Sequence, residues 1–143
     1  MIDGVLISDL SVIDVLGGSV MHGIKKSSTG YVDFGEAYFS EIQSNSIKAW
    51  KRHKKMTLNI VVPVGKIKFV LFDDRDLFGS QFQEIIISRE NYCRLTVPPL
   101  VWMGFQGLSS KGSMLLNIAD IEHDSNEVDR VDLDKIKYTW NNN

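Results

Sequence analysis

Residues 58–72 read LNIVVPVGKIKFVLF, two runs of β-branched and aromatic residues joined at Gly65. In the second run, Ile67 and Phe69 fall on one face of an extended chain and Lys68 falls on the other. This alternation is typical of an antiparallel strand with one buried face. Glycine supplies the turn chemistry that separates two strands. The stretch therefore predicts two adjacent strands.

Short runs of the same kind recur along the chain, separated by residues typical of turns. A convincing helical stripe of apolar residues is absent, and the best helical candidate is a turn or short helix near residues 127–137. About nine strands at this spacing indicate a closed barrel or two packed sheets. We therefore expect a single all-β domain over residues 1–143, with strands at Val5–Leu10, Ala37–Ile42, Ile47–His53, Leu58–Val64, Ile67–Phe72, Gln81–Ile87, Tyr92–Val97, Met103–Leu108 and Ser113–Ile121.

Composition narrows the class of protein. A chain of 143 residues can bury a substantial core. Its net charge of −2 argues against a general nucleic-acid binder, which needs a basic excess. Cys93 is the single cysteine, which excludes an internal disulfide and fits a reducing compartment. The sequence has no signal-peptide pattern, and its apolar runs are much shorter than a membrane span. We expect a soluble cytoplasmic protein with no membrane partner.

Three segments carry a resemblance to a known family. In order and spacing they are similar to the dTDP-4-dehydrorhamnose 3,5-epimerases. The tract PPLVW at residues 98–102 and residues 124–130 look closer to the dTDP-4-keto-6-deoxyglucose 3,4-ketoisomerases. The resemblance covers roughly residues 35–134 and implies a cupin, or jelly-roll, β-sandwich barrel of antiparallel strands. The three segments are IKAWKRHK at residues 47–54, VPVGKIKFVLFDDR at 62–75 and LTVPPLVWMGF at 95–105.

The resemblance also marks positions at which this chain departs from the two families. The catalytic histidine of the epimerases falls on Lys51. The ketoisomerases carry two histidines on the same strand, and these fall on Lys51 and His53, so only the second is kept. The histidine that precedes Gly-Phe in the epimerases is replaced by Met103. The later catalytic tyrosine of the epimerases falls near Leu116 or Ile121.

The residues themselves point to proton-transfer chemistry on this strand. Strand alternation predicts that Lys51 and His53 share one face, while Lys48 and Arg52 share the other. A desolvated lysine beside another cation loses pKa, and histidine titrates near neutrality, so either group can move a proton. We predict that His53 is the base and that Lys51 stabilises an enolate or acts as an alternative base. The alternative interpretation is a solvated edge, because residues 48–55 are rich in cations.

The sequence argues against a metal site. Metal-binding cupins need neutral imidazoles and carboxylates at fixed places on two strands. At the positions where metal-binding cupins have their ligands, this chain has Lys51 in place of one histidine and Leu58 in place of the glutamate. The position of the later histidine falls near Met103. We therefore expect neither a metal nor another cofactor.

Further predictions concern substrate binding. A nucleoside diphosphate attracts arginine and lysine, and aromatic rings stack on flat or apolar ligand surfaces. In the epimerase family an N-terminal segment of one subunit helps to close the neighbour's site, and an Asp-x-Arg motif lies close to the sugar. The alternatives are a solvated loop at residue 25, core packing of the rings, and a turn in which residues 73 and 75 pair with each other. The predicted contacts are Lys25, Tyr38, Lys48, Arg52, Asp73, Arg75 and Trp102.

The resemblance implies an isomerase that acts on a nucleotide-linked 4-keto-6-deoxy sugar, dTDP-linked by preference, in bacterial surface-polysaccharide biosynthesis. His53 and the short chain favour 3,4-ketoisomerisation, whereas Asp73–Arg75 and Gly104-Phe105 favour 3,5-epimerisation, and both stay open. One alternative is a non-catalytic cupin that binds a nucleotide sugar or serves as a partner subunit, and a weaker one is a lectin-like or structural β-sandwich. A homodimer is expected because exposed sheet edges need covering.

Overall fold

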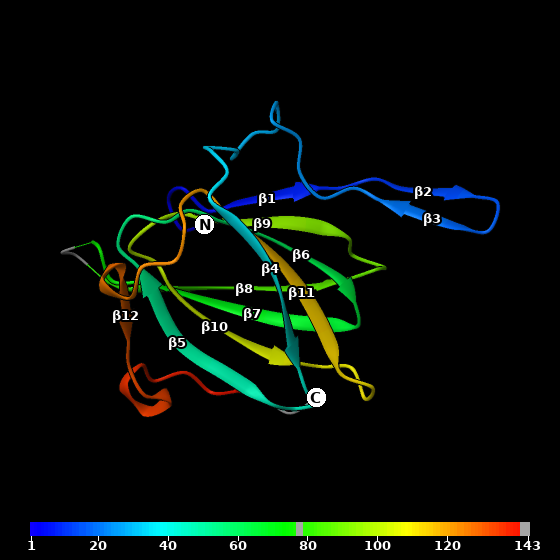
Figure 1. The fold of residues 1–143 in the computed structure, drawn as a ribbon. Coiled ribbons are helices and arrows are strands. Elements are labelled where there is room, and N and C mark those ends of the chain that lie inside the picture. The colour runs from blue at the N-terminus through cyan, green and yellow to red at the C-terminus, as the bar shows by residue number, and fades with distance from the viewer. Residues whose placement is uncertain (77–78, 141–143) are drawn as a thin grey trace.

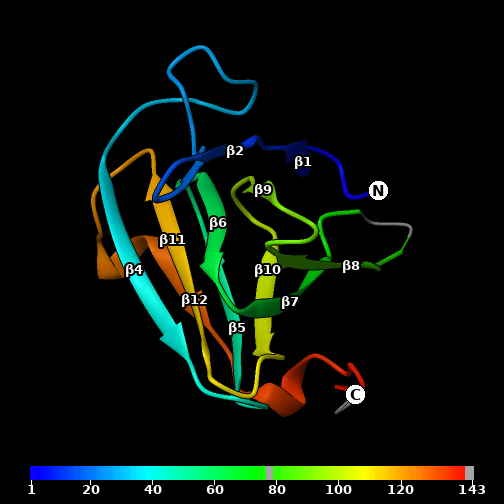
Figure 2. The same cartoon turned by 90° about the vertical axis from the view of Figure 1, so that its right-hand side faces the viewer.

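The computed structural model describes residues 1–76 and 79–140. Two five-stranded sheets face each other, and every neighbouring pair of strands is antiparallel (Figures 1 and 2). The first sheet has the order β1 (Leu6–Asp9), β9 (Cys93–Val97), β6 (Leu58–Val64), β11 (Ser113–Ala119), β4 (Glu36–Ile42). The second has the order β12 (Val128–Arg130), β5 (Ile47–His53), β10 (Trp102–Gly107), β7 (Lys66–Asp73), β8 (Gln81–Ser88). This architecture confirms the predicted all-β jelly-roll sandwich.

All the predicted strands form, with ends that differ by one or two residues. The structure adds a hairpin of β2 (Val12–Val15) and β3 (Gly18–Met21), which extends away from the sandwich (Figure 1). Gly17 and Gly18, which the sequence analysis treats as a break between elements, form its turn with positive φ. The turn or short helix expected near residues 127–137 is the 3₁₀ turn Leu133–Lys135. The short strand β12 precedes it, and a further 3₁₀ turn, Ser125–Glu127, precedes β12. Neither turn is long or apolar enough to cross a membrane, and no other helix lies in the described residues.

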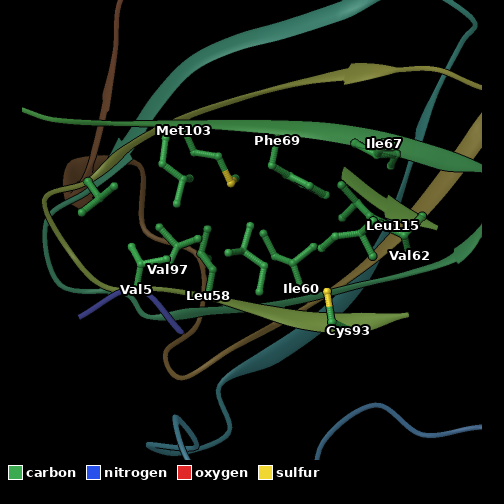
Figure 3. Packing of buried hydrophobic residues seen from close by; sticks show 14 of the residues in the cluster. Val5, Leu58, Ile60, Val62, Ile67, Phe69, Cys93, Val97, Met103 and Leu115 are labelled. Carbon is green, nitrogen blue, oxygen red and sulfur yellow. The ribbon is translucent and has the colours of Figure 1, made fainter. Parts of the chain in front are cut away.

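The core fills the space between the two sheets (Figure 3). Ile67 and Phe69 of β7 point inward, as the alternation predicts, and both are fully buried. They face Leu58 and Ile60 of β6, while Cys93 is a free, buried thiol in the same cluster. Each side chain of this size contributes roughly 1.5–3 kcal/mol when it leaves water. The core therefore fixes the spacing of the sheets.

A second apolar cluster covers the outer face of the second sheet. Trp50 is 2% exposed and packs with Val70, Trp102 and Ile136. Its indole Nε1 donates a hydrogen bond to the Leu133 carbonyl oxygen at 3.3 Å. The C-terminal segment, defined as residues 131–140, therefore lies against this face and holds β12 beside β5.

The pairing of β5 with β10 contains a bulge. Met103 lies opposite Lys51 and Phe105 lies opposite Lys48, so two steps along β10 match three along β5. Met103 and Phe105 both pack against the core, and therefore Lys48 and Lys51 face inward together. The prediction that Lys48 shares the outer face with Arg52 is wrong, because the extra residue of the bulge reverses the alternation between them.

Candidate active site

A cavity of about 870 Å³ lies between the sheets, on the side where β4 ends the first sheet and β12 ends the second. Its apolar floor comes from β6, β10 and β11. Its polar rim comes from β4, β5, β11, β12 and the C-terminal segment. The floor consists of Leu58, Ile60, Met103, Phe105 and Leu115. The rim includes Tyr38, Lys48, Lys51, Asn117, Arg130 and Lys135.

Lys51 and Arg130 place two cations side by side on the cavity wall. They are paired residues of β5 and β12, and both line the cavity. Neither side chain makes an ion pair or a hydrogen bond within the part of the chain that the structure describes. Burial lowers the pKa of the Lys51 ammonium, and the nearby Arg130 charge lowers it further, against the weaker influence of Glu127 and Glu36. The wall therefore offers an unpaired amine next to a fixed positive charge.

His53 and Glu127 form a buried pair next to this wall. His53 is 5% exposed, and its Nδ1 is hydrogen-bonded to the Glu127 carboxylate. The other carboxylate oxygen accepts the backbone N–H groups of Lys54, Lys55 and Met56 at 3.2–3.3 Å. Burial raises the pKa of the Glu127 carboxyl, but the hydrogen bonds from His53 and the backbone outweigh it, and the pKa is lowered. Glu127 is thus held as an anion.

This arrangement sets the tautomer of His53. Because Nδ1 donates its proton to Glu127, Nε2 keeps a lone pair. Burial lowers the pKa of the imidazole, although the hydrogen bond to Glu127 opposes this, so the ring is neutral at pH 7. Nε2 is buried and has no hydrogen-bond partner among residues 1–76 and 79–140. The ring itself is not part of the cavity lining. The pair supplies a base whose conjugate acid is stabilised by a carboxylate.

Tyr38 and Asn117 face each other across β4 and β11 on another side of the cavity. Burial raises the pKa of the Tyr38 phenol, so it keeps its proton at neutral pH, with the neighbouring Asn117 amide as an opposing influence. Asn117 is 2% exposed, and its amide atoms make no well-formed hydrogen bond in the described residues. A polar group buried in this way is normally satisfied by a partner. The amide is therefore available to a ligand in the cavity.

The structure brings some of the predicted site residues together. Lys51, Lys48 and Tyr38 line the cavity, and His53 lies on the same strand. Lys48 extends towards β4, where its Nζ donates to the Glu41 carbonyl oxygen at 2.6 Å and lies over the Phe105 ring.

The other predicted substrate contacts lie outside the cavity lining. Arg52 faces outward, pairs with Asp129 at 2.9 Å, and stacks on Trp102. Asp73 and Arg75 pair with each other at 2.8 Å in their own turn. The remaining residue, Lys25, lines a separate cavity of about 470 Å³.

Sequence reasoning missed Glu127, Arg130 and Asn117 as site residues. Glu127 and Arg130 lie in the tract 124–130 that resembles the ketoisomerases, which was the one available signal. Asn117 gave none, because a single asparagine in a strand has no characteristic spacing. No group of three or more potential metal ligands comes together within the described ranges.

The strand orders of the two antiparallel sheets, with a cavity between them, define a jelly-roll fold of the cupin class. No family model and no curated protein sequence matches the chain. A solved dTDP sugar isomerase from Desulfovibrio desulfuricans is 36% identical, with a TM-score of 0.91 over 96% of this chain and 91% of that one. The chain therefore belongs to the RmlC-like cupin family of dTDP-sugar isomerases and epimerases.

More distant structures share the fold. QdtA, a sugar 3,4-ketoisomerase from Thermoanaerobacterium thermosaccharolyticum solved with TDP, is 19% identical, with a TM-score of 0.77 over 94% of this chain and 93% of that one. A dTDP-4-dehydrorhamnose 3,5-epimerase from Elizabethkingia anophelis is 15% identical, with a TM-score of 0.76 over 92% of this chain and 77% of that one. Both reaction types therefore occur on this fold.

Proposed function

We propose that the protein is an isomerase of a dTDP-linked 4-keto-6-deoxy sugar and works by removing a proton next to the keto group. The observation that carries the proposal is the buried His53–Glu127 pair beside a cavity with two unpaired cations. The 36% identical dTDP sugar isomerase supports the substrate class.

Each group has a role that its surroundings favour. His53 Nε2 is the proposed proton acceptor, which requires the ring to be reached from the cavity that it adjoins, and the Glu127 carboxylate stabilises the imidazolium that results. Removal of the proton places negative charge on the keto oxygen, and Lys51 and Arg130 supply positive charge for it. Tyr38 is protonated and lines the cavity, so it is a candidate donor for the returning proton. The apolar floor suits the methyl group of a 6-deoxy sugar.

Deuterium exchange tests this function directly. The protein is incubated in deuterium oxide with dTDP-4-keto-6-deoxyglucose, and the sugar protons are followed by NMR. We expect loss of the signal at C3 or C5, or a new keto isomer, and loss of this activity in His53→Asn. The matched control is His123→Asn, because His123 is exposed and does not line the cavity. Equal exchange in His53→Asn would remove His53 from the mechanism.

A non-catalytic cupin that binds a nucleotide sugar is the second candidate. It is favoured by one observation: the His53 ring does not line the cavity. Calorimetric binding of the nucleotide sugar, combined with no exchange of its protons in deuterium oxide, would support this alternative.

We also propose that residues 1–143 form one domain that works in the cytoplasm as a homodimer, in the synthesis of bacterial surface polysaccharides. The exposed apolar side chains of the β2–β3 hairpin support a second copy as partner. They are Ile13, Val15, Leu16 and Val20.

A further inference from the structure

We propose that Lys51 attacks the keto carbon of the substrate and forms a protonated imine, so that the reaction is an epimerisation next to that carbon. This inference rests on the proposed function, because it needs a keto sugar in the cavity. It goes further by replacing the charge-stabilising role of Lys51 with a covalent one, while Arg130 remains the cation of the site, and by choosing between the two reactions that occur on the fold.

The first argument is the position of Lys51. The side chain lines the cavity, lies opposite Met103 of β10, and is half-buried. Its Nζ makes no hydrogen bond or ion pair to any residue that the structure describes. Lys48 provides a contrast within the same cavity, because its Nζ is engaged by the Glu41 carbonyl oxygen at 2.6 Å. Lys51 therefore has a nitrogen that is free to approach a ligand.

The second argument is the charge around Lys51. An amine attacks a carbonyl only as the neutral base, and proteins obtain neutral lysine by desolvation or by placing a second cation beside it. Lys51 has both, since it is half-buried and Arg130 is its paired residue on β12. The opposing groups are Glu127 and Glu36. Both carboxylates act in the opposite direction to Arg130, and Arg130 has the largest influence on the Lys51 pKa among the charged neighbours.

The third argument is that the covalent step balances without any co-reactant except water. The Lys51 nitrogen adds to C4, and the former keto oxygen takes up one proton from that nitrogen and one from solvent and leaves as water. The positive imine nitrogen then draws electrons from the adjacent C–H bond, and His53 Nε2 takes the proton to give an enamine. A proton returns to the opposite face of the same carbon. Water then hydrolyses the imine, releases the epimer and restores the amine.

This chemistry distinguishes the two candidate reactions. An epimerisation at C3 or C5 keeps the double bond from C4 to nitrogen, and water can cleave that bond. A 3,4-ketoisomerisation through the same imine would move the double bond away and leave Lys51 attached to C4 as a secondary amine. Such a bond is not hydrolysed. If Lys51 forms an imine, the reaction is therefore an epimerisation, and the keto group is still at C4 in the product.

Reductive trapping tests the inference. The protein is incubated with dTDP-4-keto-6-deoxyglucose and sodium cyanoborohydride, which reduces imines in preference to ketones, then digested and examined by mass spectrometry. We expect a stable sugar nucleotide adduct on the peptide that contains Lys51. The adduct should disappear in Lys51→Arg and persist in Lys111→Arg, an exposed lysine outside the cavity lining. Circular dichroism of both variants reports whether they fold.

The product gives a second, independent measurement on the unmodified protein. We expect deuterium at C3 or C5 of a sugar that is still a 4-ketone. Proton exchange without any adduct on Lys51, or a 3-keto product, would overturn the inference and leave the isomerase function standing. Absence of exchange, adduct and nucleotide-sugar binding together would overturn both.

Discussion

At the scale of single residues, Glu127 shows how a buried charge is kept ionised by its contacts. One carboxylate oxygen is hydrogen-bonded to His53 and the other to backbone amides, so both oxygens have partners. Removing one partner of a buried hydrogen bond leaves the other unsatisfied, which costs about 1–3 kcal/mol. The pair is therefore both a structural and a chemical unit.

We predict that Glu127→Gln lowers kcat at least tenfold and leaves KM nearly unchanged, because the neutral amide no longer stabilises an imidazolium. The free energy of unfolding should fall by about 1–3 kcal/mol, since the hydrogen bonds from His53 and the backbone lose their charged acceptor. Steady-state kinetics and urea unfolding measure the two effects. Glu122→Gln is the control, because Glu122 is exposed. An unchanged kcat would show that the carboxylate has no part in proton transfer.

We predict a specific pH dependence for the same pair. Burial lowers the pKa of His53 below its ordinary 6.5, so the unfolded chain binds a proton at a pH where the native imidazole does not. Stability should therefore fall as the pH decreases from 6.5 towards the folded pKa. The pKa of Glu127 is lowered from its ordinary 4.5, so protonation of this carboxylate causes a further loss of stability as the pH falls below 4.5. Urea unfolding between pH 4 and pH 8 should show a steeper decline for the wild-type protein than for His53→Asn, and parallel curves would contradict the assignment.

At the scale of elements, the bulge in β5 determines which cations enter the cavity. It depends on a close approach between β5 and β10 at Gly104, where a Cβ atom would lie 2.6 Å from the Cβ of Ala49 and 3.0 Å from the Trp140 ring. Glycine at this position allows the two strands and the C-terminal segment to pack together.

We predict that Gly104→Ala lowers the free energy of unfolding by about 1–3 kcal/mol, because overpacking must displace β5 or the Trp140 ring. Affinity for the nucleotide sugar should also fall, since Lys51 lies on the displaced strand. Urea unfolding and calorimetric titration check the two results. Gly23→Ala is the matched control, because nothing lies within 4 Å of the position of its added Cβ. Equal stability of the two variants would show that an added methyl group at residue 104 fits without overpacking.

The same elements show what a sequence can reveal. The alternation of Ile67, Lys68 and Phe69 is local, so the strand and its buried face can be predicted from the sequence alone. The bulge is not local: it appears only when β5 is matched to β10, and this is why the orientation of Lys48 was mispredicted. The partnership of His53 with Glu127 joins positions 74 residues apart and depends equally on strand order.

At the scale of the whole molecule, the β2–β3 hairpin leaves apolar side chains in solvent, away from both sheets (Figure 1). Leu16 at its tip is fully exposed, and Val15 is about half exposed. Apolar side chains gathered on one protruding element are typical of an interface. The hairpin is therefore the place where the proposed dimer is most easily tested.

We predict that the wild-type protein has the mass of a dimer in light scattering, and that the double variant Val15→Asp with Leu16→Asp shifts it towards the monomer. Buried aspartates at an interface would be desolvated without partners. Val64→Asp is the control, because Val64 is exposed on a different part of the surface. A monomeric wild-type mass at high protein concentration would exclude the dimer.

The late position of β12 in the chain has a consequence for synthesis. A ribosome releases β5, with Lys51 and His53, long before it releases Glu127 and Arg130. Domains tend to fold as the chain emerges, yet Glu127 and Arg130 join His53 and Lys51 only after the other strands of both sheets have been made. A chain terminated before Glu127 would therefore contain most of the sandwich without the carboxylate of the His53–Glu127 pair. We expect such a product to lack the proposed proton-transfer activity even if it folded.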